Sequence, residues 1–575
     1  MEIKNQELAR IFERIADALE LKGESGFRVL AYRKAARVLA DLAEDVTELA
    51  NQNRLKDIPG IGEGIAKKIQ EYLNTGRMKK LEEATQGLDP GLFTLLQIPG
   101  VGPKTVRLLH EQLGVKDLQD LKRVIEDGSA ARLPGMGKKK VENILKGMAT
   151  AEHSGERMFL DEAFELAQSI VKHLQSASAV KKVTYAGSLR RGKETIGDID
   201  ILATGKNTQE IIQRFLTYPH IRQVVSAGET KASILVATGK GVRQVDLRVV
   251  EDLAFGAALQ YFTGSKDHNI VLRTMAQKQG LKISEYGVFR EEQRIAGRTE
   301  EEVYQSLGLE YIPPELREDR GEIEAAKQGR LPDLITLKDI KSDLHIHTDA
   351  SDGISPLEEI VAAAQKRGYF CIAVAEHSVS AGYAGGLSED ELLRRCEEID
   401  KLNARLRGFS ILKSAEVDIT PKGELDYSDK TLAQLDLVIA SIHQAFNLEA
   451  TKRTCAAISH PLVHIIGHPS GRLIGKRPGY DIDLEKVIEY AAKFHKILEI
   501  NSFYARLDLN DTWARKAKEA GILLAINTDA HAVKDLDWML YGVITARRAW
   551  LEKKNVINTL TLKELKKLLN KIRGG

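Results

Sequence analysis

The middle of the chain contains the segment Tyr185-Ala-Gly-Ser-Leu-Arg-Arg-Gly-Lys-Glu-Thr-Ile-Gly-Asp-Ile-Asp-Ile-Leu202. Asp198 and Asp200 lie two residues apart in a β-branched run, so a strand would carry both carboxylates on one face and the isoleucines on the other. Two anions so close repel each other unless they share a divalent cation. An Asp-x-Asp pair alone is more typical of a solvated edge strand or a turn, so the surrounding residues must decide between the two interpretations.

Those surrounding residues favour a metal site. Gly187 and Ser188 offer backbone amides and a hydroxyl, and Arg191 adds a guanidinium, which together suit a polyphosphate. A third carboxylate, Asp246, lies in the run Arg-Gln-Val-Asp-Leu-Arg on another expected strand and would complete a two-metal site. In such a site one ion activates an attacking hydroxyl and the other neutralises the leaving pyrophosphate. The expected chemistry is nucleotidyl transfer.

The first 150 residues contain an internal repeat of three similar turns. They are Ile58-Pro-Gly-Ile-Gly-Glu-Gly64, Ile98-Pro-Gly-Val-Gly-Pro-Lys104 and Leu133-Pro-Gly-Met-Gly-Lys-Lys139. A single turn of this kind is more typical of a plain helix connector. Three copies followed by basic residues resemble helix-hairpin-helix motifs, whose exposed amides bind the DNA backbone without reading sequence. The expected DNA contacts are Gly60, Gly62, Gly64, Lys67, Gly100, Gly102, Lys104, Gly135 and Gly137.

The chain beyond residue 341 has a different texture. Seven short apolar runs alternate with helical segments, and each run ends in residues that could bind metal, which predicts a parallel β/α barrel with its site at the strand ends. Asp343-Leu-His-Ile-His347 places two imidazoles at strand spacing. One such histidine alone is usually a buried structural residue, but this part holds nine of the fourteen histidines. Such a mixture of imidazoles and carboxylates suits Zn²⁺, Mn²⁺ or Fe and would hydrolyse a phosphoester.

Length and composition limit the class of protein. At 575 residues the chain is long enough for several domains, and no apolar run approaches the roughly 20 residues that a bilayer requires. Three cysteines cannot form a disulfide framework, and the first helix lacks the features of a signal peptide, so a cytoplasmic location with no membrane partner is expected. The mildly basic N-terminal part permits contact with an anionic polymer but is equally consistent with an ordinary solvated face.

Taken together, these motifs resemble, over nearly the whole chain, the bacterial family X DNA polymerases, relatives of DNA polymerase beta, that carry a C-terminal polymerase and histidinol phosphatase (PHP) domain. The resemblance implies a multidomain α and α/β fold: a helical helix-hairpin-helix region, a nucleotidyltransferase palm with a mixed β-sheet, and a distorted (β/α)7 barrel. The implied domains are a gap-binding, lyase-like domain at 1–85, a fingers-type subdomain with two helix-hairpin-helix motifs at 86–150, the palm at 151–260, a thumb-type subdomain and linker at 261–335, and the PHP domain at 336–575.

The resemblance also implies roles for single residues of the palm and thumb. Metal ligands are implied at Asp198, Asp200 and Asp246, the last of which would also help to activate the primer 3′-hydroxyl. The implied nucleotide contacts are Gly187, Ser188, Arg191, Gly197, Tyr261, Phe262, Gly264, Asn269 and Arg273. The turn that begins at Tyr261 would disfavour ribonucleotides, and the last two residues of that set would monitor the nascent base pair. Lys266 stands where the beta enzyme has an aspartate, and its charge would tighten nucleotide binding.

One implied residue lies in the first hairpin. Lys68 falls where the beta enzyme carries the lysine that removes 5′-deoxyribose phosphate, a reaction that requires a deprotonated amine. Adjacent Lys67 would depress the pKa of that amine. Two lysines on a helix are also typical of solvated phosphate contacts, so both interpretations stay open, and gap binding is the expectation that does not depend on the choice.

The PHP resemblance maps metal ligands onto the histidine-rich part. The implied ligands are His345, His347, Asp352, His377, Glu416, His443, His468, Asp529 and His531. They would hold two or three ions, Mn²⁺ or Zn²⁺ or both, and support 3′–5′ exonuclease and 3′-end processing, with cleavage at abasic sites left open. Arg472 and Lys476 are expected to contact phosphate or to lie on the solvated surface.

The expected function is therefore gap-filling DNA synthesis in repair by a monomer that uses Mg²⁺ or Mn²⁺, gapped or primed DNA and deoxynucleoside triphosphates. Three alternatives are a template-independent nucleotidyltransferase, a PHP phosphatase for a small molecule, and a repair scaffold without catalysis. The three hairpins argue against the first two. The complete sets of metal ligands argue against the third.

Overall fold

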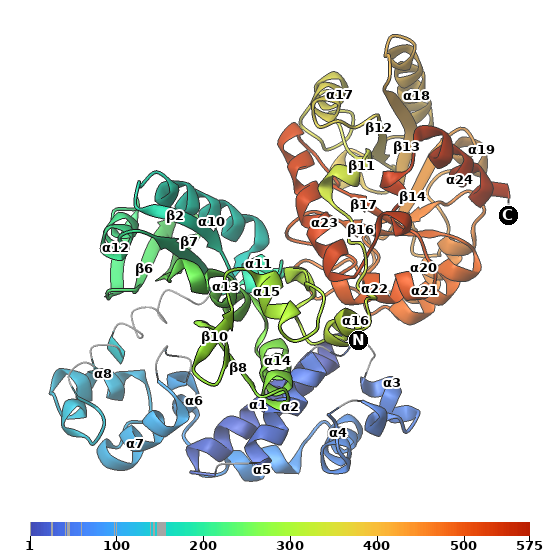
Figure 1. Cartoon of the computed structure of the whole chain (residues 1–575). Coiled ribbons are helices and arrows are strands. Elements are labelled where there is room, and N and C mark those ends of the chain that lie inside the picture. The colour runs from blue at the N-terminus through green and yellow to red at the C-terminus, as the bar shows by residue number, and fades with distance from the viewer. Residues whose placement is uncertain are drawn as a thin grey trace. The chain divides into compact units, whose positions relative to one another are not determined.

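The computed structural model describes residues 2–24, 27–40, 42, 46–58, 60–96, 98, 101–137, 140–141, 144–145 and 157–574 (Figure 1). The chain divides into two compact units. The first comprises Met1–Arg157 with Pro219–Ser226 and Ser233–Gln244, and the second comprises Met158–Tyr218, Ala227–Ala232 and Val245–Gly575. The expected DNA-binding hairpins lie in the first unit, and both expected metal sites lie in the second.

Short amphipathic helices build the N-terminal part of the first unit. In the first helix Leu8, Phe12, Ile15 and Leu19 recur every three or four residues and are buried, which is the pattern of a helix with one apolar face. Gly76 has left-handed φ where the fourth helix ends, as is typical of glycine C-caps. The helices are α1 (Glu2–Leu21), α2 (Phe27–Ala40), α3 (Val46–Asn51), α4 (Glu63–Thr75), α5 (Lys79–Thr85), α6 (Pro90–Leu95), α7 (Pro103–Leu113) and α8 (Leu118–Glu126).

A mixed five-stranded sheet with the order β2-β4-β7-β6-β5 forms the palm. Strand β4 runs antiparallel to β2 and parallel to β7, which confirms the expected mixed sheet. Strands β1 and β3 form a separate two-stranded antiparallel sheet. The elements are β1 (Met158–Phe159), α10 (Leu160–Gln175), β2 (Val180–Tyr185), α11 (Gly187–Arg190), β3 (Thr195–Ile196), β4 (Ile199–Gly205), α12 (Thr208–Leu216), β5 (Ile221–Ala227), β6 (Lys231–Thr238) and β7 (Gly241–Val249).

The thumb-type part combines helices with a small antiparallel sheet in the order β10-β9-β8. Its buried core includes Ala257, Leu272, Val288, Val303 and Tyr304. The elements are α13 (Phe255–Thr263), α14 (Lys266–Lys278), β8 (Leu281–Ser284), β9 (Gly287–Arg290), β10 (Gln293–Ala296), α15 (Glu300–Gln305) and α16 (Glu322–Lys327).

Seven parallel strands then follow in sequential order, β11 to β17, as expected for a (β/α)7 barrel. The last strand approaches the first, because a parallel bridge joins Ile346 to Ala530. The strands are β11 (Ser342–Ile346), β12 (Cys371–His377), β13 (Ser410–Asp418), β14 (Leu437–Ser441), β15 (Ile465–Ile466), β16 (Ile497–Asn501) and β17 (Leu524–Asn527). The helices are α17 (Leu357–Lys366), α18 (Glu389–Asn403), α19 (Asp429–Leu432), α20 (Ala450–Ser459), α21 (Leu484–Lys493), α22 (Asp511–Glu519), α23 (Met539–Arg548) and α24 (Leu562–Gly574).

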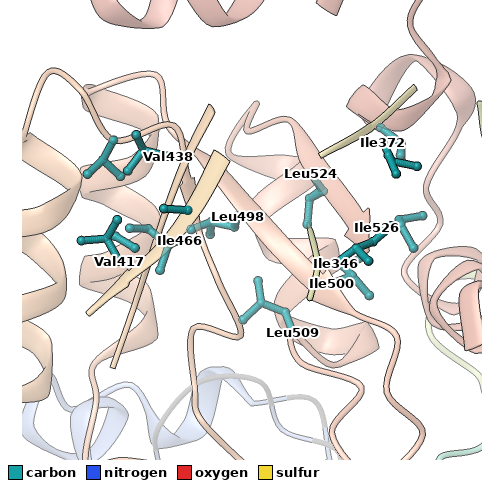
Figure 2. Packing of buried hydrophobic residues seen from close by; sticks show 14 of the residues in the cluster. Ile346, Ile372, Val417, Val438, Ile466, Leu498, Ile500, Leu509, Leu524 and Ile526 are labelled. Atoms are coloured by element: carbon teal, nitrogen blue, oxygen red, sulfur yellow. The ribbon is translucent and has the colours of Figure 1, made fainter. Parts of the chain in front are cut away.

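Alternation along the barrel strands explains where the polar ligands fall. On β12, Ile372 and Val374 belong to the large apolar cluster of Figure 2, whereas Cys371, Ala373 and Ala375 belong to a second buried cluster that includes residues of α24. Side chains two apart share a face of a strand, so His377 continues the second set at the carboxyl end of β12. Among the described residues, no helix is long and apolar enough to span a membrane.

Candidate active sites

The three palm carboxylates meet at neighbouring strands. Asp200 on β4 is the register partner of Asp246 on β7, and Asp198 directly precedes β4. Burial raises the pKa of Asp200, and the charges of Asp198 and Asp246 raise it further, to about 7, although Arg248 and Arg191 act in the opposite direction. Three mutually repelling carboxylates form an oxygen donor set that fits Mg²⁺ or Mn²⁺.

A tight turn brings backbone up to these carboxylates. Gly187 begins α11 with φ +64°, and a Cβ built there would overlap Oδ2 of Asp200. The preceding Ala186 N–H donates to the carbonyl oxygen of Asp200 at 2.8 Å. Only glycine permits both the left-handed conformation and this approach, and Ser188 follows it in α11, while Gly197 lies between β3 and β4.

The two arginines after this turn are held differently. Arg190 donates to both carboxylate oxygens of Glu300, each at 2.7 Å, and to Thr263 Oγ1 at 2.9 Å. Arg191 donates from Nε to Glu318 Oε1 at 3.1 Å and from Nη1 to the carbonyl oxygen of Thr263 at 2.9 Å. The guanidinium expected to contact triphosphate is therefore fixed by two protein partners.

The expected sugar and base contacts gather around one turn. The side-chain amide of Asn269 donates to the carbonyl oxygens of Tyr261 at 2.8 Å and Gly264 at 3.1 Å, so it braces the turn. The guanidinium carbon of Arg248 lies over the ring of Phe262, 4.7 Å from the ring centroid. Lys266 is the first residue of α14, and Arg273 lies on the same helix and donates from Nε to the carbonyl oxygen of Asn269 at 3.2 Å. The contacts of these residues with nucleotide stay predictions.

Most of the described hairpin glycines have open space beside their backbone. Gly62 and Gly102 are the N-caps of α4 and α7. A Cβ built at Gly62, Gly64, Gly102, Gly135 or Gly137 meets nothing within 4 Å, so the backbone there is open. Gly60 and Gly135 have positive φ. Gly100, expected to contact DNA, lies outside the described residues.

The lysines of the hairpins have local partners. Lys67 is exposed and its Nζ lies 3.1 Å from Glu63 Oε1. Lys68 Nζ donates to the carbonyl oxygen of Gly64 at 2.9 Å and lies 5.9 Å from the ring centroid of Tyr32. Lys104 is exposed at the start of α7. These contacts fit phosphate binding, and the lyase role of Lys68 stays a prediction.

All nine expected barrel ligands converge at the carboxyl ends of the strands. Glu416 on β13 is at the centre: its Oε2 lies 3.1 Å from His377 Nδ1 and 3.4 Å from His345 Nε2, and its Oε1 lies 2.9 Å from His468 Nε2 and 3.3 Å from His443 Nε2. Ligand atoms close enough to share an ion occur in three groups, which are His347, Asp352, His377 and His531; His345, His347 and Asp529; and His377, Glu416 and His443.

Several buried ligand atoms of this cluster lack a hydrogen-bond partner among the described residues, which fits the binding of metal ions. His345 Nε2, both ring nitrogens of His347, His377 Nδ1 and Glu416 Oε2 are buried without a hydrogen-bond partner among the residues that the structure describes. Unpartnered buried polar atoms are costly, and imidazole nitrogens with carboxylates are ligands for Zn²⁺, Mn²⁺ and Fe²⁺. The donor set therefore fits two or three such ions.

Two carboxylates that the sequence analysis missed orient the ligands. Glu499 Oε1 lies 2.8 Å from His345 Nδ1, and Asp418 Oδ1 lies 2.8 Å from His443 Nδ1. Such partners fix the tautomer of a ligating histidine and leave its other nitrogen for the metal. Asp418 carried a signal, because it follows Glu416 by two residues and so shares its face of β13.

The structure places Arg472, expected to contact phosphate or to lie on the solvated surface, in a buried ion pair. Both Nη atoms of Arg472 donate to the carboxylate of Glu194, at 3.0 and 2.9 Å, so this arginine pairs within the protein instead. Arg506, which the sequence analysis missed, has one Nη atom buried without a hydrogen-bond partner among the described residues. Burial lowers the pKa of His468, and the positive charge of Arg506 lowers it further, so this guanidinium lies near the cluster. Lys476 is exposed.

Family models match successive parts of the chain. A helix-hairpin-helix domain matches residues 3–78, a SAM-like helix-hairpin-helix tandem 93–149, the DNA polymerase beta palm 157–249, the DNA polymerase beta thumb 258–318, and the PHP domain 343–508.

Three relatives show similarity over different parts. The chain is 40% identical over 571 residues to the DNA polymerase/3′-5′ exonuclease PolX of Bacillus subtilis, covering 98% of this chain and 99% of that protein. It is 29% identical over 341 residues to DNA polymerase lambda of Rattus norvegicus, covering 55% of this chain and 56% of the relative. It is 33% identical over 231 residues to a probable phosphatase of Thermoanaerobacter, covering 38% of this chain and 89% of the relative.

Proposed function

Because this chain belongs to the family X DNA polymerases that carry a C-terminal PHP domain, we propose that it fills short gaps in DNA from a template at the palm and processes 3′ ends at the barrel. The enzyme is a DNA polymerase joined to a PHP 3′–5′ exonuclease. The observation that carries the proposal for the palm is the pairing of Asp200 with Asp246 on parallel strands beside the Gly187 turn.

At the palm, three carboxylates would hold the ions and the turn would hold the nucleotide. Asp198, Asp200 and Asp246 bind Mg²⁺ or Mn²⁺, and the bound ions supply activation of the primer hydroxyl and neutralisation of the pyrophosphate. The amides after Gly187 and the guanidinium of Arg191 bind the triphosphate. The braced turn from Tyr261 to Gly264 orients the sugar of the incoming nucleotide.

At the barrel, the nine ligands would hold two or three ions, Mn²⁺ or Zn²⁺, and the bound ions supply hydroxide and a clamp on the phosphodiester. Glu499 and Asp418 keep His345 and His443 in the tautomer that binds metal. Arg506 contacts the scissile phosphate. The substrate is the 3′ end of a DNA strand, and cleavage at abasic sites would use the same centre.

A gapped duplex with a labelled primer tests both activities in one tube. With Mn²⁺ and deoxynucleotides the primer should lengthen, with the first added base set by the template, and without deoxynucleotides it should shorten. Asp198→Ala with Asp200→Ala should abolish lengthening and spare shortening, and His345→Ala should do the reverse. Survival of both activities in both variants would refute the site assignments, and addition independent of the template base would indicate terminal transfer.

A further inference from the structure

The loop between the two halves of the palm site packs on the barrel. This loop, Arg191–Glu194, follows the Gly187 turn and precedes the palm carboxylates. A Cβ built at Gly192 would overlap Ile544 of α23, and Glu194 accepts two hydrogen bonds from Arg472. A shift of α23 would therefore move the loop that begins with Arg191.

One carboxylate joins the palm, the end of the thumb and the barrel. Glu318 Oε1 accepts from Arg191 Nε at 3.1 Å and from Arg548 Nη1 at 3.0 Å, and it lies 3.7 Å from Lys193 Nζ. Arg548, the last residue of α23, also donates to the backbone carbonyl oxygen of Arg191 at 2.7 Å. Its Nη2 pairs with Asp511 at 2.8 Å. Arg548 is thus bound to both the side-chain partner and the backbone of Arg191.

Positive charge exceeds negative charge around Glu318. Burial would raise the pKa of Glu318, but Arg548, Lys193 and Arg191 lower it to about 2, so the carboxylate stays ionised. Arg320 joins the cluster through Asp511 at 3.0 Å. The cluster therefore contains four basic groups and two carboxylates. Glu318 is shared between Arg191 and Arg548, so it does not neutralise Arg191 alone.

We propose that Arg548 of the barrel, acting through Glu318, is a positioning residue for Arg191 and so for triphosphate binding in the polymerase reaction. The inference rests on the proposed role of Arg191 in the palm. Glu318 fixes the Nε edge of Arg191 and the carbonyl oxygen of Thr263 fixes Nη1, which orients the rest of the guanidinium. Without Arg548, Glu318 is left to Arg191 and Lys193 alone and cancels more of the charge that binds the nucleotide.

The neighbouring arginine provides a matched control. Arg547, also on α23, donates to Glu315 from Nε at 2.7 Å and from Nη2 at 3.3 Å, and to the carbonyl oxygen of Ile335 at 2.9 Å. Arg547 thus pairs with a glutamate of the same segment as Glu318. None of these hydrogen bonds goes to residues 191–194. Loss of either arginine should weaken packing between α23 and that segment, and more so for the buried Arg548, which also pairs with Asp511.

The experiment measures single-nucleotide gap filling by the full-length enzyme. Arg548→Met should raise the KM for deoxynucleotide about 10-fold, the size expected when about one charge-assisted hydrogen bond is lost, with kcat changed less than threefold. Arg548→Lys should restore part of the loss. Arg547→Met should also lower the melting temperature, though less than Arg548→Met does, and should leave the KM unchanged. Shortening of the primer without deoxynucleotides should be unaffected in all three variants.

A double-mutant cycle separates this inference from the function on which it rests. Arg191→Met should itself raise the KM, and adding Arg548→Met should raise it no further, because the second residue acts through the first. An unchanged KM in Arg191→Met would refute the proposed role of Arg191. A raised KM in Arg191→Met with an unchanged KM in Arg548→Met, or equal effects of Arg548→Met in both backgrounds, would overturn the positioning role. If Arg548→Met does not fold, Glu318→Gln replaces it, and a KM within twofold of the parent enzyme would overturn the proposal.

Discussion

The palm presents three carboxylates on two strands, whereas the barrel gathers nine ligands at successive strand ends around Glu416. In the palm the negative charges repel one another, and the nucleotide side is a glycine turn that leaves backbone close to Asp200. In the barrel, imidazoles alternate with carboxylates, and Glu499 and Asp418 orient them from behind. The difference indicates that the palm site is completed by its ions and substrate, whereas the barrel site is assembled by the protein itself.

The largest expected effect concerns the centre of the barrel cluster. Glu416→Gln keeps the size of the side chain but removes the charge shared by five histidines. Shortening of a labelled primer should therefore fall by more than the roughly 10- to 100-fold expected for loss of a carboxylate behind a ligand. Bound metal, measured by elemental analysis, should fall with it, while gap filling should be retained. Normal shortening with a full metal content would show that Glu416 is not a ligand.

A methyl group should be nearly as damaging at the palm. Gly187→Ala places a side chain in a left-handed turn and against Asp200, which would force the turn away from the carboxylates. Gap filling should fall about 100-fold, since misplacement of the substrate by about 1 Å has an effect of that size. Gly205 or other strand glycines would disturb packing, so the control is Gly521→Ala at an open, positive-φ loop position of the barrel. Equal losses in both variants would show that the effect is not specific to the palm.

An intermediate effect is expected behind the barrel ligands. Glu499→Gln leaves His345 Nδ1 without its carboxylate, so metal affinity and shortening should fall 10- to 100-fold, the usual range for such partners. Asp418→Asn makes the same change behind His443. Titration of shortening activity with Mn²⁺ checks this, because high Mn²⁺ should restore much of the loss. A loss that Mn²⁺ does not restore would point to a role other than metal binding.

The smallest expected effect is a weakening of DNA binding, on which both active sites depend. Lys104→Ala removes one exposed charge beside the Gly102 cap, so DNA binding should weaken a few-fold and the salt dependence of binding should fall by about one unit of slope. Fluorescence anisotropy with gapped DNA at several salt concentrations measures this. Lys401→Ala on α18 is an exposed control that should leave the slope unchanged. An unchanged slope in Lys104→Ala would show that the second hairpin is not part of the DNA-binding surface.

The sequence predicted the two sites unequally well. Apolar runs that end in polar residues indicated a metal cluster, because the (β/α)7 fold brings the ends of such runs together. The PHP resemblance then implied which nine residues are ligands. Asp246 was found because it lies in a second run that reads as a strand. Glu499 was missed because, within a buried run, it reads as part of the strand core. The domain boundaries expected from sequence stay predictions.

Contacts between distant segments could not be read from the sequence. The sequence around Arg472 does not indicate that its partner is Glu194, which lies 278 residues away. The partner of Arg191, Glu318, is likewise not indicated by the sequence around Arg191. An arginine after a metal ligand reads as a phosphate contact until the fold supplies a carboxylate. Local patterns therefore predict the metal ligands, whereas the ion pairs that hold the palm loop to the barrel depend on tertiary packing.

Anomalous scattering from crystals soaked in Mn²⁺ with a gapped DNA and a non-hydrolysable nucleotide tests the existence of two separate metal centres most directly. Peaks are expected beside Asp198, Asp200 and Asp246, and two or three further peaks among the nine barrel ligands. In crystals without nucleotide, the barrel peaks should persist while those of the palm weaken. Absence of manganese at the barrel ligands, or palm carboxylates with no ion between them when nucleotide is bound, would show that the assigned residues do not form metal centres.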